Sequence, residues 1–425
     1  MSVFAVARRV RAYGGHFLLL AVLTLVTALL ITAVPRVADR LTGQGLREHV
    51  AGQPVARRDL TYTTQEELVP RTTWSVAGTR ASDLDTVEGR MPPAVQRVIG
   101  QRWYAARTAF ARLTGPQLTS DKGLVDLSVR SMGGVREAAG LVEGRWPEAG
   151  TTADGSVELA LADTVAGPLG LRAGNRLSLS IVDEFGKPLK TRKILLVGVF
   201  RPTDRGNGIW DSLPMMLRLT PPEGDGEPFL VVGVTADRGF DALATAGWPV
   251  GFSWRYRISP ERITPAQLDA LVDGLATLER TRPAGLTLTQ GVDIPLRQFA
   301  ESLAAARTLL AVIAAGLLAT LAGLTLLAAR LAARRRRAEY VLLRARGGST
   351  GAVLRRGLAE SALVLPAAAG VGWLLGGLLP GEGSQLRWVL VATLLATLAL
   401  PVAALAGQGG GGGRGDLIGA RSTAA

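Results

Sequence analysis

The sequence predicts an α-helical membrane protein with four transmembrane helices and a large mixed α/β extracytoplasmic domain between the first two helices. Three observations lead to this prediction. Four long stretches contain no charged residue, and most of the net charge of +13 lies in short segments beside them. Residues 35–307, in contrast, are nearly neutral and show the local patterns of a soluble domain.

The four uncharged stretches are residues 17–34, 309–329, 361–380 and 388–406. A helix needs roughly 20 apolar residues to cross the hydrocarbon core of a bilayer, and a charge at its centre costs about 2.5–3.5 kcal/mol. The hydrophobic core of a soluble protein of 425 residues would not bury four such helices. We therefore expect four membrane spans.

The first stretch could also be a secretory signal peptide, because Arg8, Arg9 and Arg11 precede it. Its apolar run is longer than that of a signal peptide, and it ends in Ala33-Val34-Pro35-Arg36 without a small-x-small cleavage pattern. We expect a retained anchor.

Orientation is predicted from the arginines, because cytoplasmic loops are enriched in Lys and Arg. Between the second and third spans lies a segment in which Glu339 is the only acidic residue among nine arginines, namely Arg330, Arg334, Arg335, Arg336, Arg337, Arg344, Arg346, Arg355 and Arg356. This segment and both chain ends are expected in the cytoplasm of a cell whose plasma membrane the chain crosses.

The expected layout follows directly. It has a cytoplasmic N-terminus at 1–16, helices at 17–34, 308–330, 361–380 and 388–406, an extracytoplasmic domain at 35–307 with a stalk helix at 296–307, a cytoplasmic segment at 331–360, a short external loop at 381–387 and a Gly-rich cytoplasmic tail at 407–425.

Several kinds of chemistry are not expected. The chain has no cysteine and only His16 and His49 as histidines, which leaves little for thiol, imidazole or metal chemistry. No phosphate-binding Gly-rich loop with Lys-Ser/Thr occurs. A Gly-x-Ser-x-Gly match at 347–351 lacks a following histidine. We expect no enzyme, no cofactor and no metal in this chain, and no nucleic acid as partner, since topology explains the basic cluster. Contact with the lipid bilayer is expected.

The external region shows helix and strand patterns. Residues 93–113 have Trp103, Ala106, Phe110 and Leu113 at helical spacing, which favours a helix. Strands are expected at 157–161, 177–182, 194–200, 229–234 and 253–258, the last one half-exposed because its Ser253, Arg255 and Arg257 alternate with apolar residues. Thr264 and Gln267 form a capping box before a helix with an apolar stripe. A helical first part and a strand-rich second part suggest two subdomains.

Residues 334–360 predict two short helices around a Gly347-Gly348 turn, with Leu342 and Leu343 between arginines. Such a segment is suited to docking a soluble partner, although an ordinary basic loop would look similar. Small residues suited to helix packing occur in the second span at Ala315, Ala319 and Gly323, and in the third at Gly372 and Gly376.

The same segment resembles the FtsX-like permease family of ABC transporters, the mechanotransmission type that includes lipoprotein-release and macrolide-export permeases. The residues that carry the resemblance are Arg336-Arg337, Glu339, Leu343-Arg344-Ala345, Gly347-Gly348-Ser349 and Glu360. The resemblance implies that Glu339, Leu342, Leu343, Arg344 and Gly347 dock in a groove of a separate ATPase subunit, which would bind the ATP and magnesium.

A second resemblance lies in the external domain, in Leu141-Val142-Glu143-Gly144-Arg145-Trp146-Pro147, Glu158-Leu159-Ala160-Leu161, residues 169–177 and Val197-Gly198-Val199. Residues 46–124 match the family by position only. The Gly-rich tail departs from longer relatives, so we expect a half-unit or a shortened form of a longer permease. Composition points to a high-GC bacterium.

The resemblance implies a permease subunit that transmits the motion of an ATPase to the external domain, for export or extraction of a lipid-, peptide- or drug-like substrate. A second permease copy or paralogue is implied as a dimer partner. Two alternatives stay open: a signalling or regulatory subunit that controls a sensor kinase or a cell-wall hydrolase without transport, and a defunct half-permease that acts as an anchor.

Overall fold

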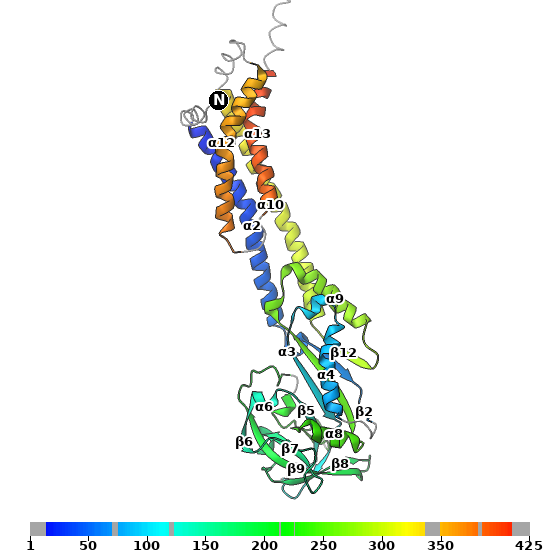
Figure 1. Ribbon diagram of the computed structural model, residues 1–425. Coiled ribbons are helices and arrows are strands. Elements are labelled where there is room, and N and C mark those ends of the chain that lie inside the picture. Colours follow the sequence, from blue (N-terminus) through cyan, green and yellow to red (C-terminus); the bar gives the residue numbers. More distant parts are fainter. Residues whose placement is uncertain are drawn as a thin grey trace, which may run out of the picture. The chain divides into compact units, whose positions relative to one another are not determined.

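The computed structural model describes residues 14–69, 75–118, 123–211, 214–224, 226–335, 349–380 and 385–409. The chain divides into two compact units (Figure 1). We call Met1–Gly45 with Glu301–Ala425 the helical unit, and Leu46–Ala300 the globular unit.

The helical unit contains four long helices, and each is long and apolar enough to cross a membrane. They are α2 (Gly14–Ala51), α10 (Asp293–Arg335), α12 (Thr350–Gly377) and α13 (Leu386–Gly409). The prediction of four apolar membrane-length helices is confirmed. α12 also includes residues 351–360, which the sequence analysis expected as a separate short helix.

The globular unit is built on strands. The strands are β1 (Asp59–Thr64), β2 (Glu67–Leu68), β3 (Ile99–Thr108), β4 (Ala111–Thr114), β5 (Val125–Met132), β6 (Ala139–Gly144), β7 (Val157–Ala162), β8 (Arg176–Val182), β9 (Pro188–Pro202), β10 (Phe229–Val234), β11 (Pro249–Ile258) and β12 (Leu286–Thr289). The helices are α3 (Val55–Arg58), α4 (Val76–Gly89), α5 (Pro93–Gln96), α6 (Val135–Ala138), α7 (Asp163–Ala166), α8 (Asp237–Thr245) and α9 (Leu268–Arg280).

The described strands form one 12-stranded sheet, in which ten strands follow the order β10-β7-β9-β8-β4-β5-β3-β11-β1-β12. The other two lie off this path, where β2 pairs with β11 and β6 pairs with β9. A further parallel pairing of β5 with β10 closes strands β10, β7, β9, β8, β4 and β5 into a 6-stranded barrel. Strands β3, β11, β1 and β12 extend from it as an open flank. The barrel interior is filled by apolar side chains such as Leu127, Val129, Leu159, Leu161, Leu179, Leu196 and Phe200.

The predicted fold class is wrong, because the chain is not an α-helical protein with a mixed domain of separate helical and strand-rich parts. A 12-stranded sheet that includes a closed barrel runs through the globular unit and uses strands from both parts. The chain therefore combines two kinds of structure, the membrane-length helices and a large β-sheet.

The helix predicted at 93–113 is also wrong. Only Pro93–Gln96 is helical, and β3 and β4 follow. Trp103 and Ala106 have helical spacing, but β3 pairs with β11 along almost its whole length and with β5 at its end. A short apolar run of this kind is compatible with both the helical and the strand period. Here the pairing with neighbouring strands determines that it forms a strand.

Strands are confirmed at the five predicted places, with wider bounds for β9 and β11. The helix after residue 264 is confirmed as α9, with Leu268, Leu271, Leu275 and Leu278 buried. The capping box is wrong, since Thr264 makes no side-chain cap hydrogen bond and a 3₁₀ turn at Pro265–Gln267 precedes α9.

Candidate functional site

At one end of the helical unit all four helices pack together. Phe17 and Leu20 of α2 meet Leu365 of α12, Leu400 of α13 and a row of alanines from α10, namely Ala328, Ala329, Ala332 and Ala333. Alanine is small enough for close approach of helix backbones, which suits helix packing in lipid. This alanine-lined cluster joins α10 to the other three helices.

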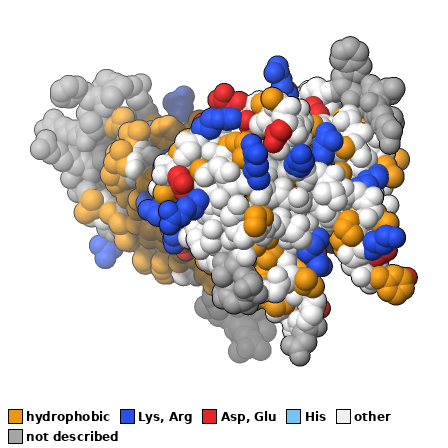
Figure 2. Space-filling model, turned by 90° about the horizontal axis from the view of Figure 1, so that it is seen from below, with side chains coloured by type: hydrophobic (Ala, Val, Ile, Leu, Met, Phe, Trp, Pro, Cys, Tyr) orange, Lys and Arg blue, Asp and Glu red, His pale blue; other side chains and the backbone are white. Residues whose placement is uncertain are grey.

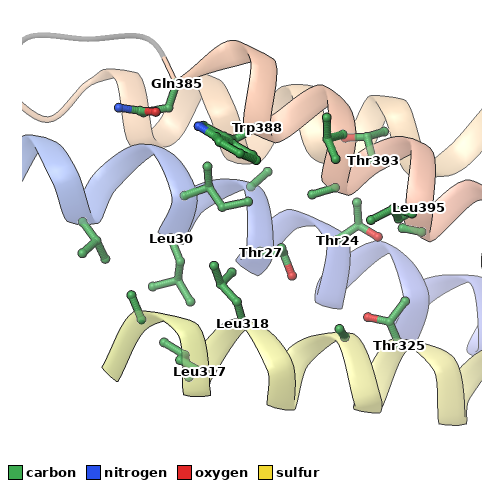
Figure 3. Close-up of a pocket in the computed structure, with 18 of the residues that line it drawn as sticks. Thr24, Thr27, Leu30, Leu317, Leu318, Thr325, Gln385, Trp388, Thr393 and Leu395 are labelled. Atoms are coloured by element: carbon green, nitrogen blue, oxygen red, sulfur yellow. The ribbon is translucent and has the colours of Figure 1, made fainter. Parts of the chain in front are cut away.

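Beyond this cluster, α2, α10 and α13 surround an apolar cavity of about 860 Å³. Figure 3 shows Leu30 of α2, Leu317 and Leu318 of α10, and Trp388 of α13 around it. Four threonines also line it, Thr24, Thr27, Thr325 and Thr393. Each of their hydroxyl groups donates to the carbonyl oxygen four residues earlier in its own helix, at 2.7–2.8 Å. The hydroxyl protons of these four threonines are therefore already engaged in hydrogen bonds within the helices.

The glycines predicted for helix packing in the third span lie against α2. A Cβ atom built on Gly372 would be 2.3 Å from the carbonyl oxygen of Leu25, and one on Gly376 would be 2.8 Å from the Cβ of Thr32. Both positions require the absence of a side chain.

The three small residues predicted in the second span are placed differently. Ala315, Ala319 and Gly323 of α10 are exposed within the single chain, and a Cβ on Gly323 would have no neighbour within 4 Å. In contrast to Gly372 and Gly376, these three positions are therefore not enclosed by the described residues of this chain.

Polar contacts also fix the helices. Nη1 of Arg36 on α2 donates to the carbonyl oxygens of Gly377, at 2.6 Å, and Leu379, at 3.2 Å, where α12 ends. A cation at a helix C-terminus satisfies free carbonyls and complements the helix dipole. Between α12 and α13, the buried Ser361 hydroxyl is 3.0 Å from the carbonyl oxygen of Thr397.

The predicted ATPase-docking residues Glu339, Leu342, Leu343, Arg344 and Gly347 lie outside the described residues. Nothing in the structure tests their roles, and they remain predictions from the sequence.

In the globular unit, two arginines of β11 form a buried ionic cluster that was not predicted from the sequence. Arg255 and Arg257 were expected on a half-exposed strand, but β11 lies between β1 and β3, and Arg255 is 5% exposed. Asp59 of β1 accepts from both, at 3.3 Å and 2.8 Å, and Asp211 accepts from Arg257 at 2.8 Å. Burial lowers the pKa of Arg255 to about 10, against the attraction of Asp59.

Trp103 of β3 connects this cluster to a small polar cleft. Both guanidinium carbons lie over its ring, at 4.1 Å for Arg255 and 5.0 Å for Arg257. The cleft, of about 330 Å³, is lined by Gln101, Arg102, Trp103, Gly134, Glu137, Ala138, Asn207 and Ile209. Arg102 is committed to Asp85 and Glu88 of α4.

A second buried carboxylate joins two of the external motifs that carry the family resemblance, 141–147 and 158–161. Glu158 is 1% exposed and accepts from the guanidinium of Arg145 and from the backbone N–H groups of Glu148 and Ala149, at 2.9 Å and 3.1 Å. The hydrogen bonds from Arg145, and then those from the two backbone groups, lower the pKa of Glu158 to about 2.

The lowered pKa of Glu158 predicts a pH dependence. Because the folded pKa lies below the ordinary value of 4.5, the stabilisation by Glu158 is present above that value and is lost as pH falls toward 2. The unfolding midpoint of the wild type should exceed that of Glu158→Gln most at neutral pH, and the difference should shrink between pH 4.5 and 2. Thermal unfolding of both proteins across this range measures it, and a constant difference would contradict it.

The surface of the globular unit carries charges of both signs. Figure 2 shows Lys and Arg side chains spread over one face, with Asp and Glu side chains and separate hydrophobic side chains between them. In the part of the chain that the structure describes, no group of three or more His, Cys, Asp or Glu side chains could hold a metal ion.

No protein-family description and no curated protein matches the chain. Among solved structures, the chain is similar to a domain of a protein described as a permease, from Porphyromonas gingivalis, with 12% identity, 56% of this chain and 91% of that chain covered, and a TM-score of 0.24. At this TM-score the likeness supports neither a shared fold nor a shared activity. The structure itself shows, among its described residues, four helices that are long and apolar enough to cross a membrane.

Proposed function

We propose that this chain is the membrane subunit of an ABC transporter of the FtsX-like permease type. In this proposal a separate ATPase subunit binds ATP and docks on the segment that contains Glu339 and Arg344. Its motion passes through the membrane helices to the globular unit outside the cell, and drives export or extraction of a lipid-, peptide- or drug-like substrate.

The observation that carries the proposal is the length of α2 and α10. They have 38 and 43 residues, hence lengths of about 57 Å and 65 Å, whereas a bilayer core of about 30 Å needs roughly 20 residues. α2 contributes its last residues, and α10 its first, to the globular unit. α2 contains Pro35 in its interior, where a proline favours a kink, whereas the proline of α10 lies in its first turn. In this proposal α10 is therefore the helix that passes a displacement along its length.

Two further features support the proposal. The described part of α10 reaches Arg335, four residues before Glu339, the first of the predicted docking residues. Its exposed Ala315, Ala319 and Gly323 offer a surface for a second permease copy or paralogue.

Co-purification tests the docking role. Replacing Glu339 and Arg344 by glutamine together should abolish co-purification of an ATP-hydrolysing subunit from native membranes, because the docking segment would lose both of the charges that it is proposed to present to the ATPase. The matched control is Arg334→Gln with Arg335→Gln, which removes two charges at the end of α10, outside the motif. Retention of the ATPase by the first variant, or its loss from both, would contradict the assigned roles.

Orientation is tested separately, and the absence of native cysteine makes the test simple. Ser349→Cys and Phe185→Cys each place one thiol in the chain, the latter at a side chain that is 86% exposed in the globular unit. An impermeant maleimide added to intact cells should label the variant at 185 and not the variant at 349. The reverse pattern would overturn the proposal.

A further inference from the structure

Arg130 of β5 is a buried arginine without a counter-charge. Its side chain is 8% exposed, and its enclosed Nε makes no hydrogen bond. Among the ion pairs and side-chain hydrogen bonds of the described residues, none involves the Arg130 guanidinium. Buried arginines in proteins are almost always paired, so this position needs an explanation.

The charged neighbour of Arg130 is a second arginine. Arg107 of β3 lies directly opposite Arg130 in the antiparallel register, and residues opposite each other project from the same face of a sheet. Arg107 forms a long ion pair with Glu66, in which Nη2 is 3.7 Å from Oε1. Both of these side chains are more than a third exposed. An exposed pair at this distance neutralises little charge.

The same sheet contains an internal comparison. Arg255 and Arg257 are also two neighbouring arginines on one strand face, but Asp59 and Asp211 lie within hydrogen-bonding distance of them, and the carbonyl oxygen of Gly208 accepts from Arg255 at 2.7 Å. Where the fold encloses arginines for its own structure, it supplies carboxylates. At Arg107 and Arg130 it does not.

The charge of Arg130 persists at neutral pH. Burial, and then the repulsion by Arg107, lowers its pKa to about 10, which still leaves the guanidinium protonated near pH 7. In a partly desolvated position such a charge attracts an anion more strongly than it would in water.

We infer that Arg107 and Arg130 form a binding site for a compact oxyanion, a phosphate or a carboxylate group, supplied by a molecule outside the chain. The Ser128 hydroxyl donates to the carbonyl oxygen of Thr108 at 2.8 Å, so its proton is engaged within the sheet. The two guanidinium groups supply the positive charge of the site, which selects a full negative charge over a neutral polar group. The small exposed area of Arg130 limits the ligand at this point to one anionic group. This inference is independent of the proposed transport function.

The test uses the full chain in detergent, with sodium phosphate, sodium acetate and sodium chloride at matched ionic strength. Phosphate or acetate should raise the thermal unfolding midpoint in a saturable way, and chloride should not. Arg130→Met should weaken the binding measured by calorimetry by about tenfold or more, the scale of one charge-assisted contact. The same substitution should raise the midpoint in buffer without oxyanions, because it removes the unpaired charge.

Arg112→Met is the matched control. Arg112 is paired with Asp126 of β5 at 2.6 Å, so this variant should keep the response to oxyanions. A stronger response to phosphate identifies a phosphoryl group as the ligand, and a stronger response to acetate identifies a carboxylate. If Arg130→Met fails to fold, Arg107→Met, at a more exposed position, must lose the response instead. No difference between oxyanions and chloride in the wild type, or an unchanged response in the variants, would overturn the inference.

Discussion

Replacing Asp59 with asparagine should lower the free energy of unfolding of the globular unit by about 3–5 kcal/mol, the usual cost of removing one partner from a buried ion pair. Asp59 is 3% exposed and accepts from both Arg255 and Arg257. Its loss would leave Arg255 without a carboxylate in ion-pair contact and Arg257 with Asp211 alone. Arg257 also joins β11 to the loop that carries Asp211, so the damage should extend beyond β1.

The measurement is urea unfolding of the full chain in detergent, followed by tryptophan fluorescence and by limited proteolysis of the globular unit. The control is Asp85→Asn, because Asp85 also pairs with an arginine but its side chain is 77% exposed. Exposed pairs contribute about 0–1 kcal/mol. Equal losses in the two variants would show that burial does not determine the stability of these pairs.

Replacing Gly372 with valine should separate α2 from α12. A Cβ at this position would lie 2.3 Å from the carbonyl oxygen of Leu25 and 3.1 Å from the Cβ of Ala28, and backbone atoms cannot move aside as a flexible side chain can. Overpacking of a tight contact costs about 1–3 kcal/mol and sometimes more. We expect the helix contact to open, since no side chain can fit in the present geometry.

Cysteine cross-linking measures this contact without background, because the chain has no native cysteine. Ala28→Cys and Ala369→Cys place two thiols in one buried cluster of α2 and α12. Oxidation should form a disulfide between the two cysteines when position 372 is glycine, and should not form it when Gly372→Val is also present. The control Gly370→Val adds the same side chain to the same helix at a place with no neighbour within 4 Å, and should leave the link intact. Efficient linking in both variants would refute the close contact.

The membrane helices could be predicted because lipid imposes a strong compositional rule. A charge in residues 17–34 or 309–329 would have been costly, so its absence is informative. The stalk helix expected at 296–307 lies within α10, which begins at Asp293, whereas the extension of α2 to Ala51 was not expected. Beyond the membrane these helices contain charged residues, and part of their surface is buried by contacts such as those of Leu46, Val50 and Leu296.

The sheet and its ionic clusters could not be predicted in the same way. Arg255 and Asp59 are 196 residues apart, and only the pairing of β1 with β11 brings them together. The alternation of Arg255 and Arg257 with aromatic residues correctly indicated a strand, yet it gave no information on what covers the polar face. Likewise, the closure of the barrel depends on the parallel pairing of β5 with β10, which local sequence does not encode.

The entrance and exit of the globular unit lie next to each other. β1 pairs with β12 from Thr61↔Thr289 to Thr64↔Leu286, and the rings of His49 and Phe299 are 5.6 Å apart. A segment whose two ends meet can be removed or exchanged without changing the distance that the flanking chain must bridge. The globular unit is thus suited to grafting: a foreign domain with adjacent termini could be spliced between α2 and α10, and evolution could have diversified this region by the same route while the membrane helices stayed as they are.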